Sequence, residues 1–128
     1  MKCLWLVLFV TVFSCNSKPK DCTDFKTGTF EYKNASFKDW IIIRNDSIQI
    51  EFNKKENIKI VGEIKWHNNC EYSLVYKEVS DITRKNKLGT KVEIKIVKKS
   101  GDIYKYEAYN GSDHTNDWIV KISNNVEL

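Results

Sequence analysis

Apolar and polar residues alternate along most of the chain from residue 27 onward. In the stretch 58–66 apolar residues and a glycine occupy every second position, and lysine or glutamate stands between them, with Val61 the one exception. Alternation over short segments is typical of strands that bury one face and expose the other. We therefore predict an all-β fold with strands over 27–33, 40–44, 48–52, 58–67, 70–79, 90–99, 103–110 and 117–122.

Each predicted strand is expected to turn its apolar positions inward. Glu51, in the strand 48–52, then belongs to the outer face and pairs with lysines across strands. The inward residues of the same strand and of the last one include Ile48, Ile50 and Phe52, and Trp118 and Ile122.

Clusters of Asn, Asp, Gly, Ser and Lys separate these strands, as in 45–47, 54–57, 68–69, 100–102 and 110–111. Short turns of this composition join sequential antiparallel strands into a meander. Eight such strands can close into an up-and-down barrel, and the alternative is a two-layer β-sandwich. Only 79–88, between two strong strands, suggests a short helix or an irregular loop.

The first residues are typical of a targeting segment rather than of a part of the folded domain. Lys2 precedes the apolar run 4–15, which is about half the roughly 20 residues that a membrane-spanning helix needs. A positive residue, a short apolar core and a small residue at its end are typical of a secretory signal peptide. We predict that residues 1–14 are such a signal.

The sequence VFSC, residues 12–15, resembles the lipobox of bacterial lipoproteins, in the relaxed form found in Bacteroidota. The resemblance implies that Cys15 carries lipid, and that the chain is held in the cell envelope by two or three acyl chains, which anchor stably. Residues 15–21 are then a lipidated tether and 22–128 a single β domain. We expect the outer membrane, facing the periplasm, with surface exposure as the alternative.

Four cysteines leave one pair for the folded domain. Cys3 leaves with the signal and Cys15 takes the lipid, so Cys22 and Cys70 remain in an oxidising compartment. An even pair there predicts a disulfide. Closing a loop of that length stabilises a fold by about 4 kcal/mol in the chain-entropy model.

Composition and motifs indicate no nucleic-acid partner, no cofactor and no catalytic or metal site. The formal net charge is +4, with lysines and glutamates interspersed rather than clustered as a nucleic-acid surface requires. Neither His67 nor His114 belongs to a recognisable catalytic motif, and zinc needs more ligands than His67 and Cys70 provide.

Large aromatic residues fall mainly on the predicted inner face. They either fill a solid core or line a cavity for one small ligand, since eight-stranded barrels do both. Hydroxyl groups and a strand-end arginine could then meet the polar group of an apolar ligand. The candidate cavity residues are Trp40, Arg44, Trp66, Tyr76, Tyr106 and Trp118.

Several stretches of the mature chain together resemble a known family. They are CxxFKTGTF from residue 22, RNDSIQIE from 44, KWxxxCxYxL from 65 and LGTxVxI from 88. The combination is similar to small flavobacterial lipoproteins of unassigned role, some of which carry the label DNA topoisomerase IV. A secreted chain this short has no room for a topoisomerase, so that label is set aside. Gly28-Thr29-Phe30 also resembles the Gly-x-Trp start of lipocalins.

Three functions remain open from the sequence. The first is a non-catalytic, membrane-anchored lipoprotein that contacts another envelope protein, which a large exposed apolar patch would support. The second is a carrier of a small lipophilic ligand. The third is a hydrolase that depends on His67 or His114. We favour a non-catalytic binding or interaction role, with the carrier as the alternative.

Overall fold

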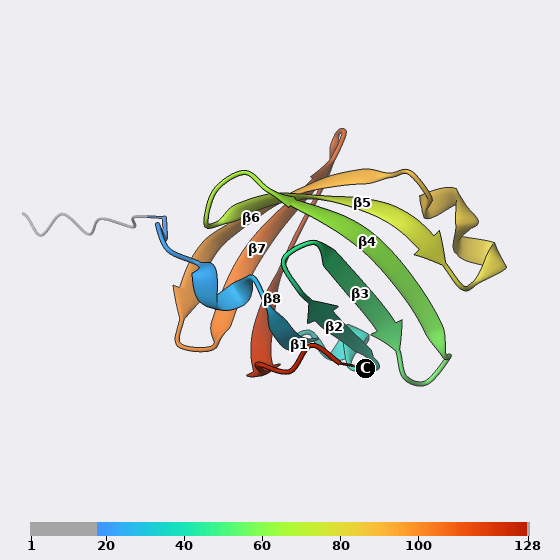
Figure 1. Cartoon of the computed structure of the whole chain (residues 1–128), viewed down its shortest axis with the longest axis horizontal. Helices are drawn as coiled ribbons and strands as arrows, with labels where there is room; N and C mark the ends of the chain where they lie inside the picture. Colours follow the sequence, from blue (N-terminus) through green and yellow to red (C-terminus); the bar gives the residue numbers. More distant parts are fainter. Residues whose placement is uncertain (1–17, 128) are drawn as a thin grey trace, which may run out of the picture.

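The computed structural model describes residues 18–127, which form eight antiparallel strands closed into a barrel (Figure 1). The strands pair in chain order, and the first also pairs with the last. Their bounds are β1 (Gly28–Tyr32), β2 (Trp40–Arg44), β3 (Ile48–Asn53), β4 (Ile58–Trp66), β5 (Glu71–Val79), β6 (Lys91–Ser100), β7 (Ile103–Asn110) and β8 (Asp113–Ser123). The predicted all-β meander barrel is confirmed, and the pairing of β1 with β8 excludes the open sandwich.

Three short 3₁₀ helices, η1 (Thr23–Phe25), η2 (Ala35–Phe37) and η3 (Ile82–Lys87), lie outside the barrel wall. η3 occupies the segment where a short helix or loop was predicted, and the Asp81 side chain caps it by accepting a bond from the Thr83 amide at 3.0 Å. In Figure 1, η1 (blue) and η3 (yellow) lie at opposite ends of the barrel. Among residues 18–127 no helix is both long and apolar enough to span a membrane.

η1 closes one end of the barrel. It places Phe25 against the ring of Tyr104, with ring centres 4.6 Å apart and both side chains buried. The Cys22–Cys70 disulfide ties this helix to the turn between β4 and β5, with the two Cα atoms 5.0 Å apart. The predicted disulfide is therefore confirmed. The signal peptide and the lipidated Cys15 lie outside the described residues.

The predicted orientation of β3 is wrong. Glu51 stands in register between Ile42 of β2 and Ile60 of β4, both of which are buried inside. Side chains of directly opposed residues point to the same face of a sheet. The polar residues of β3 therefore face the interior, where Gln49 is 4% exposed, and Ile48 is 40% exposed outside.

The tight turn between β2 and β3 causes this inversion. The Asn45 amide donates to the Ile48 carbonyl at 3.0 Å, and the Asn45 side-chain oxygen accepts bonds from the amides of Ser47 and Ile48. This turn sets Arg44 opposite Gln49. Because Arg44 points inward, Gln49 must do so as well, and one residue of shift exchanges every side chain between the two faces.

β8 is also turned the other way from its prediction. Ile119 is opposite Tyr104 of β7, and both are buried. The neighbouring Trp118 is opposite Lys105 and is 37% exposed, and Ile122 is exposed as well. The apolar residues of 118–122 are too many to sit on one face, so the pairing with β7 decides which of them is inside.

Candidate functional site

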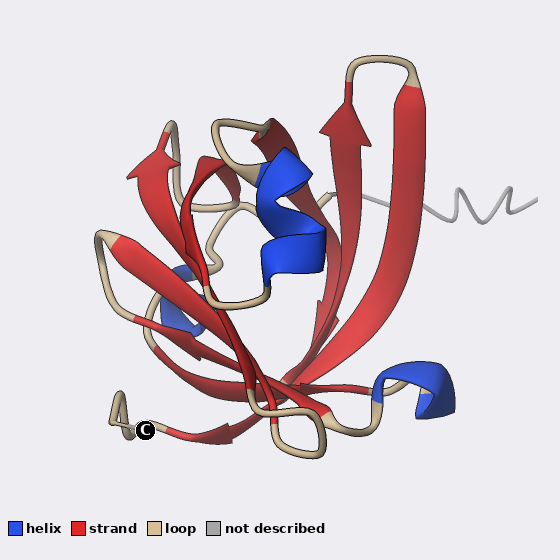
Figure 2. Ribbon diagram, turned by 90° about the vertical axis from the view of Figure 1, so that its right-hand side faces the viewer, coloured by secondary structure: helices blue, strands red, loops and turns tan. Residues whose placement is uncertain are grey.

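A cavity of about 500 Å³ lies inside the barrel. Its lining comes from seven strands and from the η3 segment, which crosses the end of the barrel that faces the viewer in Figure 2. Exposed residues mark its mouth: Asn86 and Lys87 on η3, and Asn110 and Asp113 beside the β7–β8 turn. The volume falls within the range of about 300–1,000 Å³ that is usual for small-molecule sites.

The cavity brings together three of the six residues proposed from the sequence. Arg44 lies at its closed end, and Tyr76 and Tyr106 line its wall on β5 and β7, with β6 between them. The apolar lining between them includes Leu74 and Ile94. A mostly apolar wall with a few fixed polar groups is typical of a site that orients one ligand.

The three tryptophans of that prediction lie outside the cavity lining. Trp118 is on the outer surface. Trp66 packs on Tyr72 with ring centres 4.5 Å apart, and its buried Nε1 has no hydrogen-bond partner within residues 18–127. Trp40 opens β2 and lies 5.6 Å from the guanidinium carbon of Arg84. None of the three contributes to the wall of the cavity.

Arg44 is completely buried and satisfied by neutral groups. Its Nη1 donates to the Phe25 carbonyl at 2.7 Å, its Nη2 to the Tyr104 hydroxyl at 3.1 Å, and its Nε to Gln49 Oε1 at 3.0 Å. The guanidinium also lies 4.7 Å from the ring centre of Phe30. Burial opposes its charge and is the largest single effect, but Tyr104, Tyr72 and Tyr32 together outweigh it and raise the pKa of Arg44, so the residue stays cationic.

Arg44 fixes the orientation of the next polar residue. Because the Gln49 oxygen accepts from Arg44, the Gln49 amide nitrogen points the other way and donates to Glu51 Oε1 at 2.9 Å. The Tyr76 hydroxyl donates to the same Glu51 oxygen at 3.3 Å. Glu51 is partly buried, and its removal from bulk water raises its pKa; the two hydrogen bonds and the charges of Lys87 and Arg44 only partly offset that rise.

Four tyrosines lie near enough to Glu51 for its charge to act on them, and the hydroxyl of one, Tyr76, bonds to it. Burial raises the pKa of each of these phenols, and the nearby Glu51 charge adds to the rise, so all remain neutral donors. The hydroxyls of Tyr32 and Tyr106 line the cavity and make no hydrogen bond within the described chain. The four residues are Tyr32, Tyr72, Tyr76 and Tyr106.

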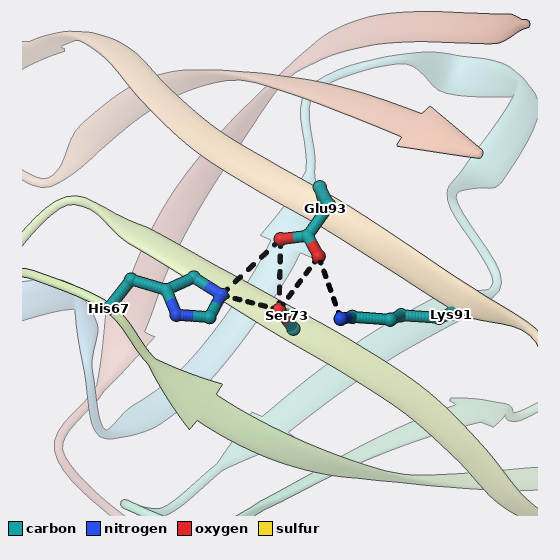
Figure 3. Close-up of polar contacts among 4 residues, drawn as sticks. All are labelled: His67, Ser73, Lys91 and Glu93. Atoms are coloured by element: carbon teal, nitrogen blue, oxygen red, sulfur yellow. Dashed lines mark hydrogen bonds and ion pairs between the residues drawn. The ribbon is translucent and has the colours of Figure 1, made fainter. Parts of the chain in front are cut away.

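A second polar cluster lies on the outer wall, where β5 and β6 pair (Figure 3). The Ser73 hydroxyl contacts both carboxylate oxygens of Glu93 at 2.9 and 3.0 Å and His67 Nε2 at 2.5 Å. His67 Nε2 is also 3.4 Å from Glu93 Oε2, and the Lys91 ammonium is 3.3 Å from Glu93 Oε1. Partial burial raises the pKa of Glu93, but the bonds from Ser73 and Lys91 outweigh it and hold the pKa below its usual range.

This outer cluster contains the residue types of a serine hydrolase in a different arrangement. In a catalytic triad the histidine takes the serine proton, while the carboxylate binds the other ring nitrogen. Here Glu93 approaches the same Nε2 that faces Ser73, and it also competes for the serine proton. Neither Ser73 nor His67 lines the barrel cavity. The geometry fits an ion-paired surface network.

The second histidine has a similar surface setting. His114 stacks on the Tyr109 ring with centres 4.6 Å apart, and its Nε2 lies 3.9 Å from Glu107. In the portion of the chain that the structure describes, no three His, Cys, Asp or Glu residues are grouped so that they could hold a metal ion.

Sequence reasoning missed Gln49, Glu51 and Tyr32 as cavity residues. Glu51 was assigned to the outer surface because it alternates with large apolar residues. The signal that could have placed it is the short β2–β3 connection, since a tight turn after Arg44 forces Gln49 and then Glu51 onto the face that Arg44 occupies.

Comparison with known proteins adds no relative. No family model matches the chain, no curated protein matches it, and no solved structure matches it. The likeness to lipocalins extends to an eight-stranded antiparallel closed barrel and no further.

Proposed function

We propose that this chain is a non-catalytic, membrane-anchored envelope lipoprotein that carries one small lipophilic ligand inside its barrel. The observation that carries the proposal is the cavity of about 500 Å³, open at the η3 end and closed at the η1 end. A barrel filled by side chains would leave no such space. The cavity therefore favours the carrier over an unspecified interaction role.

The envelope location is part of the proposal. A disulfide between Cys22 and Cys70 supports an oxidising compartment such as the periplasm. Pro19, in the predicted tether, lies against the closed end, where its carbonyl is 3.4 Å from Cys70 Sγ. A lipid on Cys15 would then hold the closed end toward the membrane and leave the mouth facing away. The same proposal includes that this chain is a member of the small flavobacterial lipoproteins.

Anchoring is tested with a Cys15→Ser variant. The unchanged protein is expected in the membrane fraction and the variant in the soluble periplasmic fraction. A variant that still sediments with membranes contradicts the anchor.

Ligand carriage is tested by native mass spectrometry of the Cys15→Ser protein isolated from an oxidising periplasm. We expect a non-covalent adduct that disappears under denaturing conditions, and its mass would begin to identify the ligand. A bare mass, two hydrogens short because of the disulfide, from protein isolated out of the natural host would contradict the carrier.

The outer face of β2 and β3 favours a second function, contact with another envelope protein. Ile41 opposes Phe52 and Ile43 opposes Ile50 in register on the face away from the cavity, where Ile43 is buried and the other three are partly exposed. Together with the exposed Ile48, the three partly exposed residues give an outward apolar strip, and exposed apolar patches often mark interaction sites. A photo-crosslinker in place of Ile48, at the exposed edge of this face, should give a discrete product in cells. The same crosslinker in place of Lys77 on β5 is the control, and equal products at both sites refute the contact.

A further inference from the structure

Glu51 is a carboxylate that forms no ion pair with any residue the structure describes. Within residues 18–127 both of its hydrogen bonds end on Oε1, from Gln49 and Tyr76. Its Oε2 accepts no bond. A carboxylate removed from water is unfavourable unless a positive charge or several donors compensate it.

Two cations act on Glu51 through their charge without bonding to it: the exposed Lys87 at the mouth of the cavity and the buried Arg44. Arg44 cannot serve as the counter-ion. It lies at the closed end and connects to Glu51 only through Gln49, and its donors already meet three acceptors. The Arg44 guanidinium is therefore already bonded to protein groups, and an anionic ligand would find few free donors at the closed end. Among the described residues of this cavity, Oε2 of Glu51 is the free charged acceptor, and the hydroxyls of Tyr32 and Tyr106 are also without a partner.

Aromatic rings surround that acceptor. Tyr32, Tyr76 and Tyr106 line the cavity on three different strands, and all three phenols are near enough to Glu51 for its charge to raise their pKa. The faces of tyrosine rings attract cations. A carboxylate within a group of tyrosines matches a protonated amine, with the apolar remainder of the molecule against Leu74 and Ile94.

We propose that the ligand of this cavity is an organic amine with an apolar body, and that Glu51 is its counter-ion. The proposal rests on the proposed carrier function, since it names the chemical class of what the barrel holds. Gln49 acts as a positioning residue, because its amide holds Oε1 and leaves Oε2 directed to the ligand. No covalent step is involved.

The test uses three probes of one shape and different charge: tryptamine, which is cationic, tryptophol, which is neutral, and indole-3-propionate, which is anionic. Binding to the Cys15→Ser protein at neutral pH is measured by calorimetry. Binding inside the barrel is recorded separately by methyl NMR, because the methyl groups of Leu74 and Ile94 line the cavity. We expect tryptamine to bind about tenfold or more tighter than tryptophol, as a hydrogen bond to a charged group implies.

Two matched variants locate the selectivity. Glu51→Gln keeps the size of the side chain and removes the charge, so the preference for tryptamine should disappear while tryptophol still binds. Glu78→Gln is the control: Glu78 is exposed and opposite Val61, and should leave the preference intact.

The outcomes separate this inference from the carrier function. If the methyl signals shift but the three probes bind alike, or the anion binds tightest, the amine assignment is wrong and the carrier function stands. If none of the probes shifts the signals of Leu74 and Ile94, both are contradicted. A preference for tryptamine that survives Glu51→Gln refutes the role of Glu51.

Discussion

Replacing Arg44 with lysine would test the closed end of the barrel. Lysine keeps the charge but has one ammonium in place of a planar fork, so it cannot reach Gln49, Phe25 and Tyr104 together. Gln49 faces the cavity, where water can replace a lost donor. The Phe25 carbonyl and the Tyr104 hydroxyl are in the sealed end, where water cannot.

The magnitude follows from counting the acceptors that lose their donor. Lysine can satisfy one of the two sealed acceptors, and the other is left buried without a partner, which costs about 1–3 kcal/mol. Loss of the stacking of the guanidinium on Phe30, 4.7 Å away, adds about 0.5–1 kcal/mol. We expect Arg44→Lys to lower the free energy of unfolding by about 2–3 kcal/mol and Tm by about 10 °C.

Urea denaturation followed by circular dichroism measures this loss. Arg84→Lys is the matched control, because Arg84 is partly exposed on η3, pairs with Asp81 at 3.5 Å and should change stability by less than about 0.5 kcal/mol. A loss below about 1 kcal/mol for Arg44→Lys, or equal losses in the two variants, would refute the assignment of Arg44 to a sealed hydrogen-bond network.

Three further predictions concern stability. Replacing Cys22 and Cys70 together by alanine should lower the free energy of unfolding by about 4 kcal/mol, because the bond closes a loop with a sequence separation of 48; a loss under about 1 kcal/mol in urea titration would contradict this. The folded-state pKa of Glu51 is above its usual 4.5, so its ionisation destabilises the fold as pH rises through that pKa. Glu51→Gln should therefore gain Tm relative to the unchanged protein as the pH rises above 4.5, and a difference that stays flat with pH speaks against it. Gly62→Ala should lower the free energy of unfolding by about 1–3 kcal/mol in the same titration, because the new Cβ would lie 2.4 Å from Leu74 Cδ1 in the buried wall. An unchanged midpoint would contradict this, since Leu74 would then have moved aside without cost.

The strands of this barrel were predictable because period-two alternation and turn residues are local signals. The predicted bounds of 40–44 and 103–110 coincide with β2 and β7. The bounds of β3, β4 and β5 differ by one residue at one end and those of β1 and β6 by one residue at each end, whereas β8 begins four residues earlier than predicted. The disulfide was also predictable, since cysteine count and compartment left one pair. These features depend on neighbouring residues or on simple arithmetic.

The phase of an alternating strand is a different kind of information. Alternation says that one face is polar, but the pairing with neighbouring strands decides whether that face looks outward. For β4 the apolar face is inside, as predicted, with Ile60 and Ile64 buried. For β3 the turn after Arg44 places the polar residues inside, which is the reverse of the predicted orientation. The predicted position of Glu51 is wrong for the same reason, so sequence reasoning located the arginine of the cavity but not its carboxylate.

The reversal of β3 itself supports a ligand site. Ile50 and Phe52, which stay partly exposed on the outer face, were available to fill the interior, where complete burial would add part of the roughly 1.5–3 kcal/mol that a fully buried side chain of this size contributes. Instead the chain directs Gln49, Glu51 and Asn53 inward, so it loses apolar burial and encloses a charge. Natural proteins depart from the most stable pattern mainly where function requires it. A polar strip that reaches from the sealed arginine to the wall of an open cavity is such a departure, and binding an amine there would recover part of the lost stability.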